Sequence, residues 1–304
     1  MSTTALILPV RNAGPHLDRL LPALAGQTLQ PDEWLALDSE SSDGSAERLR
    51  AAGARVVTIP AREFNHGGTR ALASRLVGGD VLIYLTQDAI PADRHCLRRL
   101  RDAVLMAPDI GMAYGRQLPR PDAGVLEAHA RAFNYPAASR TKRLSDAPEL
   151  GIKTCFCSDA CAAYRRAALE RVGGFPADVI GTEDAHVAGR MLLNGWALRY
   201  EAEARVYHSH DYTLLEEMRR YFDIGVFYGR ERWIFRHFGS AGGEGRKFLH
   251  SELAAARACG QPWRQAEAVL RAALKWLGYR LGHIERGLPR PLKRRLSMFP
   301  GYWK

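Results

Sequence analysis

The chain has 304 residues, of which 46% are hydrophobic and 25% are charged. This balance can bury a large core and excludes a disordered or low-complexity protein. No uncharged run approaches the roughly 18 to 20 residues that span a bilayer, and the N-terminus lacks the basic region and cleavage site of a secretion signal. We therefore expect a cytoplasmic protein.

The five cysteines indicate neither a disulfide framework nor a zinc site. Cys155, Cys157 and Cys161 lie close together in the sequence, but an odd number of cysteines in a cytoplasmic chain argues against paired disulfides. Their spacing also matches no standard zinc motif.

The net charge of +10 comes entirely from the last third of the chain. Residues 1–211 contain 25 Lys and Arg against 25 Asp and Glu, whereas residues 212–304 contain 18 against 8. We therefore predict a boundary near residue 211, between a neutral first domain and a basic C-terminal region. A basic region of this kind suits an anionic partner, either a membrane surface or a nucleic acid.

The first 85 residues alternate between strand-like and helix-like segments. Apolar runs at residues 5–10, 33–38, 55–60 and 80–85 predict buried strands, and helical patterns cover residues 16–27 and 45–53. Short strands between helices predict an α/β protein with a mostly parallel, doubly wound sheet. Such sheets bind ligands at the carboxyl ends of their strands.

Polar residues stand at those carboxyl ends. Arg11 and Asn12 follow the first strand, Asp38 ends the second, and Asp88 follows the fourth. No G-x-G-x-x-G motif follows the first strand, which disfavours a dinucleotide site. Asp38 is equally compatible with a simple turn, because Ser, Asp and Gly residues follow it.

Paired glycines, Gly67 and Gly68, precede Thr69 and Arg70 at the start of a helix. Glycines let a backbone approach a ligand, and a helix N-terminus with an arginine nearby favours phosphate. A loop that needs positive φ explains the same glycines equally well.

A second group of candidates lies between residues 183 and 210. The apolar spacing after residue 184 predicts a helix with Glu183 and Asp184 near its N-terminus, where acidic residues often only compensate the helix dipole. Here the acidic pair follows a glycine-rich loop and precedes a strand-like segment that ends in His208 and His210. That combination favours a functional site.

Several motifs in a fixed order carry a resemblance to a known family: ILPVRN, LDSESSDGS, LTQDA, VGGF, TED followed by AGRMLLNGW, and VYHSH. In this order, over residues 4–212, they resemble the inverting GT-A glycosyltransferases of family 2. FNHGGTR together with LTQDAIP is similar to bacterial rhamnosyltransferases that use dTDP-L-rhamnose. The resemblance implies a GT-A catalytic domain at residues 1–211 and a helical appendage at residues 212–304.

The resemblance implies that Asp88 binds a divalent metal, Mg²⁺ or Mn²⁺. Its position corresponds to the last acid of a D-x-D motif, but Thr86 and Gln87 stand where the upstream acid would be. Mg²⁺ often uses only one or two protein carboxylates. His208 or His210 could supply a second ligand, which would suit Mn²⁺ better, although an ordinary interface histidine is equally compatible.

The resemblance also implies roles in transfer. Asp184 corresponds to the general base that takes the proton from the acceptor hydroxyl as it attacks the anomeric carbon with inversion, and Glu183 would orient the acceptor or the base. The implied substrate-binding residues are Pro9, Val10, Arg11, Asp38, Gly67, Gly68, Arg70 and Gln87. Asp38 would contact the nucleotide base and Arg70 the diphosphate, although Ala71 departs from the usual Asn.

The basic C-terminal region has two interpretations. Leucines at helical spacing, with Arg and Lys between them, run through residues 270–284, and the chain ends in LKRRLSMFPGYWK. These helices would pack on the catalytic domain, or lie on the anionic inner face of the cytoplasmic membrane, or both. The second interpretation fits a polyprenyl-diphosphate-linked saccharide acceptor, which the resemblance implies for surface polysaccharides such as O-antigen.

Other function classes fit less well. A nucleotidyltransferase would carry a glycine-rich and basic activating loop after its first strand, and residues 9–20 do not resemble one. Nucleic-acid binding would explain the basic region, but the sequence contains no recognisable module for it, so we expect no nucleic-acid partner. A glycosyltransferase with a UDP-sugar donor is the main alternative.

Overall fold

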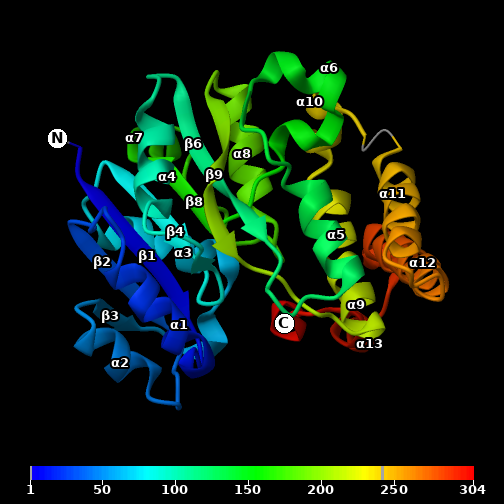
Figure 1. The fold of residues 1–304 in the computed structure, drawn as a ribbon, viewed down its shortest axis with the longest axis horizontal. Helices are drawn as coiled ribbons and strands as arrows, with labels where there is room; N and C mark the ends of the chain where they lie inside the picture. The colour runs from blue at the N-terminus through cyan, green and yellow to red at the C-terminus, as the bar shows by residue number, and fades with distance from the viewer. Residues whose placement is uncertain (1, 241–242) are drawn as a thin grey trace.

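A single mixed sheet forms the centre of the computed structural model, which describes residues 2–240 and 243–304. The strand order is β3-β2-β1-β4-β8-β6-β9-β5, with β7 paired to β9 (Figure 1). The strands are β1 (Thr4–Val10), β2 (Glu33–Asp38), β3 (Arg55–Thr58), β4 (Val81–Leu85), β5 (Ile90–Pro91), β6 (Ile110–Leu118), β7 (Arg140–Lys142), β8 (Cys161–Arg165) and β9 (Ala197–Tyr207). The α/β class predicted from the sequence is confirmed.

Helices cover the sheet and extend beyond it. They are α1 (Gly14–Ala25), α2 (Ser45–Ala51), α3 (His66–Leu76), α4 (Cys96–Leu105), α5 (Val125–Asn134), α6 (Ala147–Leu150), α7 (Arg166–Arg171), α8 (Glu183–Leu193), α9 (Leu214–Arg230), α10 (Arg232–Phe238), α11 (Glu244–Ala258), α12 (Arg264–His283) and α13 (Arg290–Leu296). Short 3₁₀ turns lie at Ala61–Glu63, Leu144–Asp146, Gly151–Cys155, Glu285–Gly287 and Pro300–Tyr302. Throughout the described ranges, no helix combines the length and the apolar character needed to cross a membrane.

Strand pairing brings two distant loops together. β1 pairs in parallel with β2 and β4, as the alternation of strands and helices predicts. β8 is antiparallel to β4, and Cys161 at its start lies opposite Leu85 at the end of β4. The loop before β8, residues 156–160, therefore lies beside the loop that carries Asp88.

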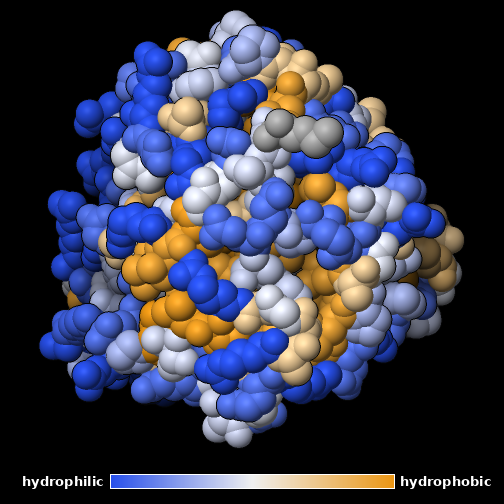
Figure 2. All heavy atoms as spheres, turned by 90° about the vertical axis from the view of Figure 1, so that its left-hand side faces the viewer, coloured by the Kyte–Doolittle hydropathy of each residue, from blue (hydrophilic) through white to orange (hydrophobic). Residues whose placement is uncertain are grey.

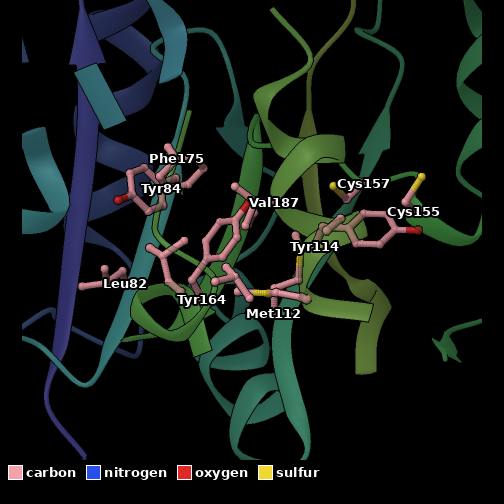
Figure 3. Packing of buried hydrophobic residues seen from close by; sticks show 14 of the residues in the cluster. Leu82, Tyr84, Met112, Tyr114, Cys155, Cys157, Tyr164, Phe175 and Val187 are labelled. Carbon is pink, nitrogen blue, oxygen red and sulfur yellow. The ribbon is translucent and has the colours of Figure 1, made fainter. Parts of the chain in front are cut away.

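The two faces of the sheet bury separate cores. Leu6 and Leu8 of β1 pack with α1 and α4, whereas Ala5 and Ile7 point to the face covered by α3 and α8, because successive strand residues alternate. On that second face Tyr84, Tyr164 and Phe175 pack edge to face, with ring centroids 5.2 to 5.6 Å apart (Figure 3). These three aromatic residues belong to the same buried cluster as Val187 of α8.

The helices after residue 211 continue the second core. Phe222, Val226 and Phe227 of α9 belong to the same buried cluster as the aromatic residues of β4 and β8. α12 packs closely on α9, because a Cβ atom on Gly278 or Gly282 would overlap carbonyl oxygens of α9. α12 lies on the outer side of the molecule (Figure 1), where its Ala268 joins Leu126 of α5 and Ala256 of α11 in a small separate cluster.

The opposite side of the molecule carries the edge strand β3 (Figure 1). Hydrophobic residues in the middle of this side are bordered and interrupted by hydrophilic ones (Figure 2). In β3 itself, Val56 and Val57 are half-buried between exposed Arg55 and Thr58. A charged residue on an edge strand discourages pairing with another chain.

Candidate functional site

The loops after β1 and β4 are joined by Gln87. Its side-chain oxygen accepts a hydrogen bond from the N–H of Arg11 at 2.8 Å, and its amide donates to the carbonyl of Arg11 at 3.1 Å. Val10 is buried, Pro9 is half-buried and the Arg11 side chain is exposed. Gln87 therefore fixes one loop to the other, a role that the sequence did not reveal.

Asp38 presents an unpaired oxygen at the end of β2. The residue is only 2% exposed, and its Oδ2 accepts a hydrogen bond from the N–H of Ser41 at 3.1 Å. Its Oδ1 is buried and has no partner in the structure. A buried carboxylate oxygen without a donor costs free energy, so this atom is suited to accept a hydrogen bond from a ligand.

Asp88, His208 and His210 form the one group in the described part of the chain that could hold a metal ion. Their ligand atoms lie within 4.8 Å of one another, and the Nε2 atom of each histidine is 3.5 Å from Oδ2 of Asp88. Two imidazoles and a carboxylate suit Mn²⁺ better than Mg²⁺, which prefers oxygen ligands. The donor set therefore fits a divalent cation.

Hydrogen bonding orients this group. Nδ1 of His208 lies 3.0 Å from the side-chain oxygen of Gln117, so an Nδ1–H donor there leaves Nε2 free to face Asp88. Burial raises the pKa of Asp88, but the hydrogen bond and charge of His208 outweigh it, and this pKa stays well below its usual value. Burial and the neighbouring His208 lower the pKa of His210 to about 3. The group therefore combines a charged Asp88 carboxylate with a neutral His210 imidazole.

Asp184 is the second residue of α8, and Thr182, the residue before the helix, has a φ of +62°. Its Oδ1 accepts a hydrogen bond from the N–H of Ala185 at 2.7 Å, and its Oδ2 from the N–H of Asp159 at 3.4 Å. Burial and the charges of Glu183 and Asp159 raise the pKa of Asp184 to about 8. A carboxyl group with a raised pKa is suited to take up a proton near neutral pH.

Arg70 lies in a buried ion-pair network beneath Asp184. Its guanidinium contacts Oδ2 of Asp159 at 3.1 Å and Oε1 of Glu183 at 2.8 Å, and all three side chains are at most 6% exposed. The hydroxyl of Tyr164 donates to Asp159 at 2.5 Å. Arg70 is therefore already engaged by two carboxylates, and Glu183 is held by Arg70 rather than free to bind an acceptor.

The paired glycines lie in the first turn of α3, not in a loop. Neither has positive φ, in contrast to one of the two interpretations of the sequence. A Cβ on Gly67 would overlap the carbonyl of Pro176, and one on Gly68 would meet the side chain of Asn65, which caps the helix. Both glycines thus allow close packing around α3.

The loop at residues 156–160 contacts both Gln117, which faces His208, and Asp184. The Gln117 amide that faces His208 also donates to the hydroxyl of Ser158 at 2.8 Å. The next residue, Asp159, supplies the N–H that reaches Asp184. Neighbouring residues of one loop therefore position both halves of the site.

Arg220 of α9 is a cation that the sequence analysis missed. Its side chain is exposed, donates to the hydroxyl of Tyr212 at 3.0 Å, and forms no ion pair with any described carboxylate. Tyr212 in turn stacks on His210, with centroids 5.0 Å apart. The charge of Arg220 also acts on His66, whose pKa burial lowers. Arg220 thus contacts Tyr212, which in turn stacks on His210 of the candidate metal-binding group.

The chain is similar to known glycosyltransferases over most of its length. Residues 5–173 match the family model described as Glycosyl transferase family 2. The chain is 43% identical to the O-antigen chain rhamnosyltransferase RfbN of Salmonella typhimurium, over 98% of this chain and 95% of that protein. It is 40% identical to the O-antigen chain rhamnosyltransferase WbaN of Salmonella anatum, over 100% of this chain and 96% of that protein.

Solved structures with low sequence identity share the fold. A mannosyltransferase from Pyrobaculum calidifontis, in complex with GDP-Man and Mn²⁺, matches with a TM-score of 0.64 at 19% identity, over 94% of this chain and 88% of that one. S. aureus TarS 1–349 with UDP-GlcNAc matches with a TM-score of 0.54 at 15% identity, over 93% and 91%. The GT-A fold implied by the sequence is confirmed.

Proposed function

The chain belongs to glycosyl transferase family 2, and from this premise we propose that it transfers L-rhamnose from dTDP-L-rhamnose to a saccharide during O-antigen assembly. The identity to two O-antigen rhamnosyltransferases over nearly the whole chain supports the donor sugar. The proposed reaction type is supported mainly by the loop at residues 156–160, which contacts both the side of the site with Asp88 and the side with Asp184.

In the proposed reaction Asp184 acts as the general base. Its carboxylate takes the proton from the acceptor hydroxyl while that oxygen forms a bond to the anomeric carbon. The bond from this carbon to the diphosphate oxygen breaks, and dTDP leaves on the opposite face, with inversion. A divalent cation held by Asp88, His208 and His210 would neutralise charge on the departing diphosphate.

The remaining polar residues receive roles that follow from their surroundings. The unpaired Oδ1 of Asp38 accepts a hydrogen bond from the nucleotide base, beside Pro9 to Arg11. Arg220, exposed and without an ion pair, binds the diphosphate in place of Arg70. Arg70 becomes a positioning residue, because it fixes Glu183 and Asp159 around the base.

We further propose that the protein acts at the inner face of the cytoplasmic membrane on a lipid-linked saccharide. α12 exposes Leu270, Trp276 and Leu277, and Ile284 follows the helix directly; these four residues are exposed at fractions between 41% and 65%. Exposed Arg280 lies among them, and residues 212–304 carry the whole net charge of +10. An exposed apolar face with cations around it suits an anionic membrane.

A thermal-shift panel tests the donor. The ligands are dTDP-rhamnose, dTDP-glucose, UDP-GlcNAc, UDP-galactose and GDP-mannose, each with and without Mn²⁺. We expect selective stabilisation by dTDP-rhamnose with Mn²⁺, because a ligand that binds only the folded state raises the Tm. Stabilisation by a UDP-sugar instead would reject the rhamnose donor while keeping the glycosyltransferase.

A further inference from the structure

The end of the chain returns to the loop that precedes the base. Residues 297–304 follow α13, yet they pack against residues 178–181 and against α3 of the catalytic part. Figure 1 shows the C-terminus between the sheet and the helical side of the molecule. The sequence left open whether this region packs on the catalytic part or faces a membrane, and it did not indicate which loop the tail would contact.

Anchors on both sides fix this segment. The N–H of Met298 donates to Oδ2 of Asp223 on α9 at 2.8 Å. Beyond it, the hydroxyl of Tyr302 donates to the carbonyl of Asp178 at 2.8 Å, and Trp303 is only 7% exposed. Two cations, Arg230 and Lys293, lie over the Trp303 ring at 5.5 and 5.2 Å from its centroid. The backbone around Phe299 is thus held from two directions.

Phe299, between these anchors, is left 38% exposed. Its ring packs edge to face on His66 with centroids 4.8 Å apart, and its Cε2 would lie 3.9 Å from a Cβ on Gly181. Gly181 precedes Asp184 by three residues, and His66 is near enough to Glu183 and Arg220 for their charges to act on it. The partly exposed ring therefore lies against the residues that precede α8 and against the first residue of α3.

We propose that Phe299 binds the acceptor sugar and, with His66, forms one wall of the acceptor subsite next to Asp184. The inference rests on the proposed function, because it concerns the molecule whose hydroxyl Asp184 deprotonates. An aromatic ring offers a flat apolar surface to the C–H face of a sugar, and ligand sites usually combine such rings with a few polar groups. The anchored tail presents this ring at a fixed place.

Acceptor kinetics test this assignment. Transfer from dTDP-L-rhamnose is measured to octyl glycosides of galactose, glucose, mannose, N-acetylglucosamine and rhamnose, and the best of these is used for the variants. For Phe299→Ala we expect the KM for the glycoside to rise on the order of tenfold or more, with donor binding unchanged. Phe299→Tyr and Phe299→Trp should restore most of the affinity, because each keeps a ring.

A matched control separates binding from general packing. Trp263 is more exposed than Phe299, at 68%, and it lies directly before α12, outside both proposed binding surfaces, so Trp263→Ala should leave the KM for the glycoside unchanged. An unchanged KM in Phe299→Ala, or a loss of donor binding equal to the loss of transfer, would overturn the inference. Failure of the wild-type protein to bind dTDP-rhamnose or to transfer to any glycoside would instead overturn the proposed function on which it depends.

Discussion

The two acidic groups of the site differ in what surrounds them. Asp88 faces two imidazoles, and its pKa stays low although burial acts to raise it. Asp184 has Glu183 and Asp159 as neighbours, and burial with their negative charges raises its pKa. One carboxyl group is thus prepared to remain charged and bind a cation, whereas the other is prepared to accept a proton.

One loop, residues 156–160, contacts the surroundings of both acidic groups. Ser158 accepts a hydrogen bond from Gln117, which contacts His208 beside Asp88. The N–H of the adjacent Asp159 donates to Asp184. Arg70 limits the repulsion among the buried carboxylates, because it pairs with two of them. Substitutions that affect only one side should separate metal binding from proton transfer.

Loss of the base should have the largest effect. We expect Asp184→Asn to lower kcat by about 10²- to 10⁴-fold, the usual contribution of a general base, while Mn²⁺-dependent donor binding persists. Steady-state kinetics of rhamnose transfer measure the change. Asp178→Asn, at an exposed position of the same loop, is the control and should be nearly fully active. Full activity of Asp184→Asn would reject the assignment.

Removal of Arg70 should disrupt the acidic side alone. Arg70→Met leaves Asp159 and Glu183 buried without a cation, so we expect the free energy of unfolding to fall by about 3 to 5 kcal/mol. Urea denaturation measures the loss, and Arg75→Met, exposed on the same helix, is the control. A variant of unchanged stability that no longer binds dTDP would contradict the positioning role and indicate that Arg70 binds the diphosphate.

A smaller effect should follow from Gln117→Leu. This substitution removes the partner of His208 Nδ1 without touching Asp88. Partners of metal-binding histidines typically contribute 10- to 100-fold in affinity, so we expect Mn²⁺ binding to weaken by about that factor. Calorimetry measures the affinity, and Gln30→Leu, at an exposed position after α1, serves as the comparison. Equal affinities in the two variants would contradict the orienting role.

The pH dependence of transfer should report on Asp184. The base is active only when deprotonated, and its pKa is raised to about 8, so kcat/KM should rise with pH below that value and level off above it. Below the pKa the rise is about tenfold per pH unit. Asp159→Asn removes one negative neighbour and should move the profile to lower pH. A flat profile from pH 6 to 9 would be inconsistent with this assignment.

Much of the N-terminal fold could be predicted from the sequence, because its strands are apolar runs separated by helices. The predicted strands at residues 5–10, 33–38 and 80–85 correspond closely to β1, β2 and β4. β8 was not predicted, since it is short, contains two alanines, and begins at Cys161, the last of the three clustered cysteines. Its antiparallel place in the sheet depends on pairing with residues distant in sequence, which periodicity does not reveal.

The site was predicted where residue chemistry alone is informative. Asp88, His208 and His210 have side chains of the types that bind metals, and the structure brings them together. The sequence does not reveal burial, so it did not show that Arg70 already has two carboxylate partners. Arg220 was missed because it follows Arg219 on one helix, and only the packing of α9 determines which arginine points toward the site. Phe299 was missed because the sequence does not show that residues 297–304 fold back onto the loop before α8.

The contrast between Asp88 and Asp184 is tested most directly by calorimetric titration of dTDP with Mn²⁺ into Asp88→Asn and Asp184→Asn. We predict that Asp88→Asn loses Mn²⁺-dependent binding of dTDP, whereas Asp184→Asn binds both as the wild-type protein does. Retention of Mn²⁺-dependent binding by Asp88→Asn, or its loss in Asp184→Asn, would contradict the account.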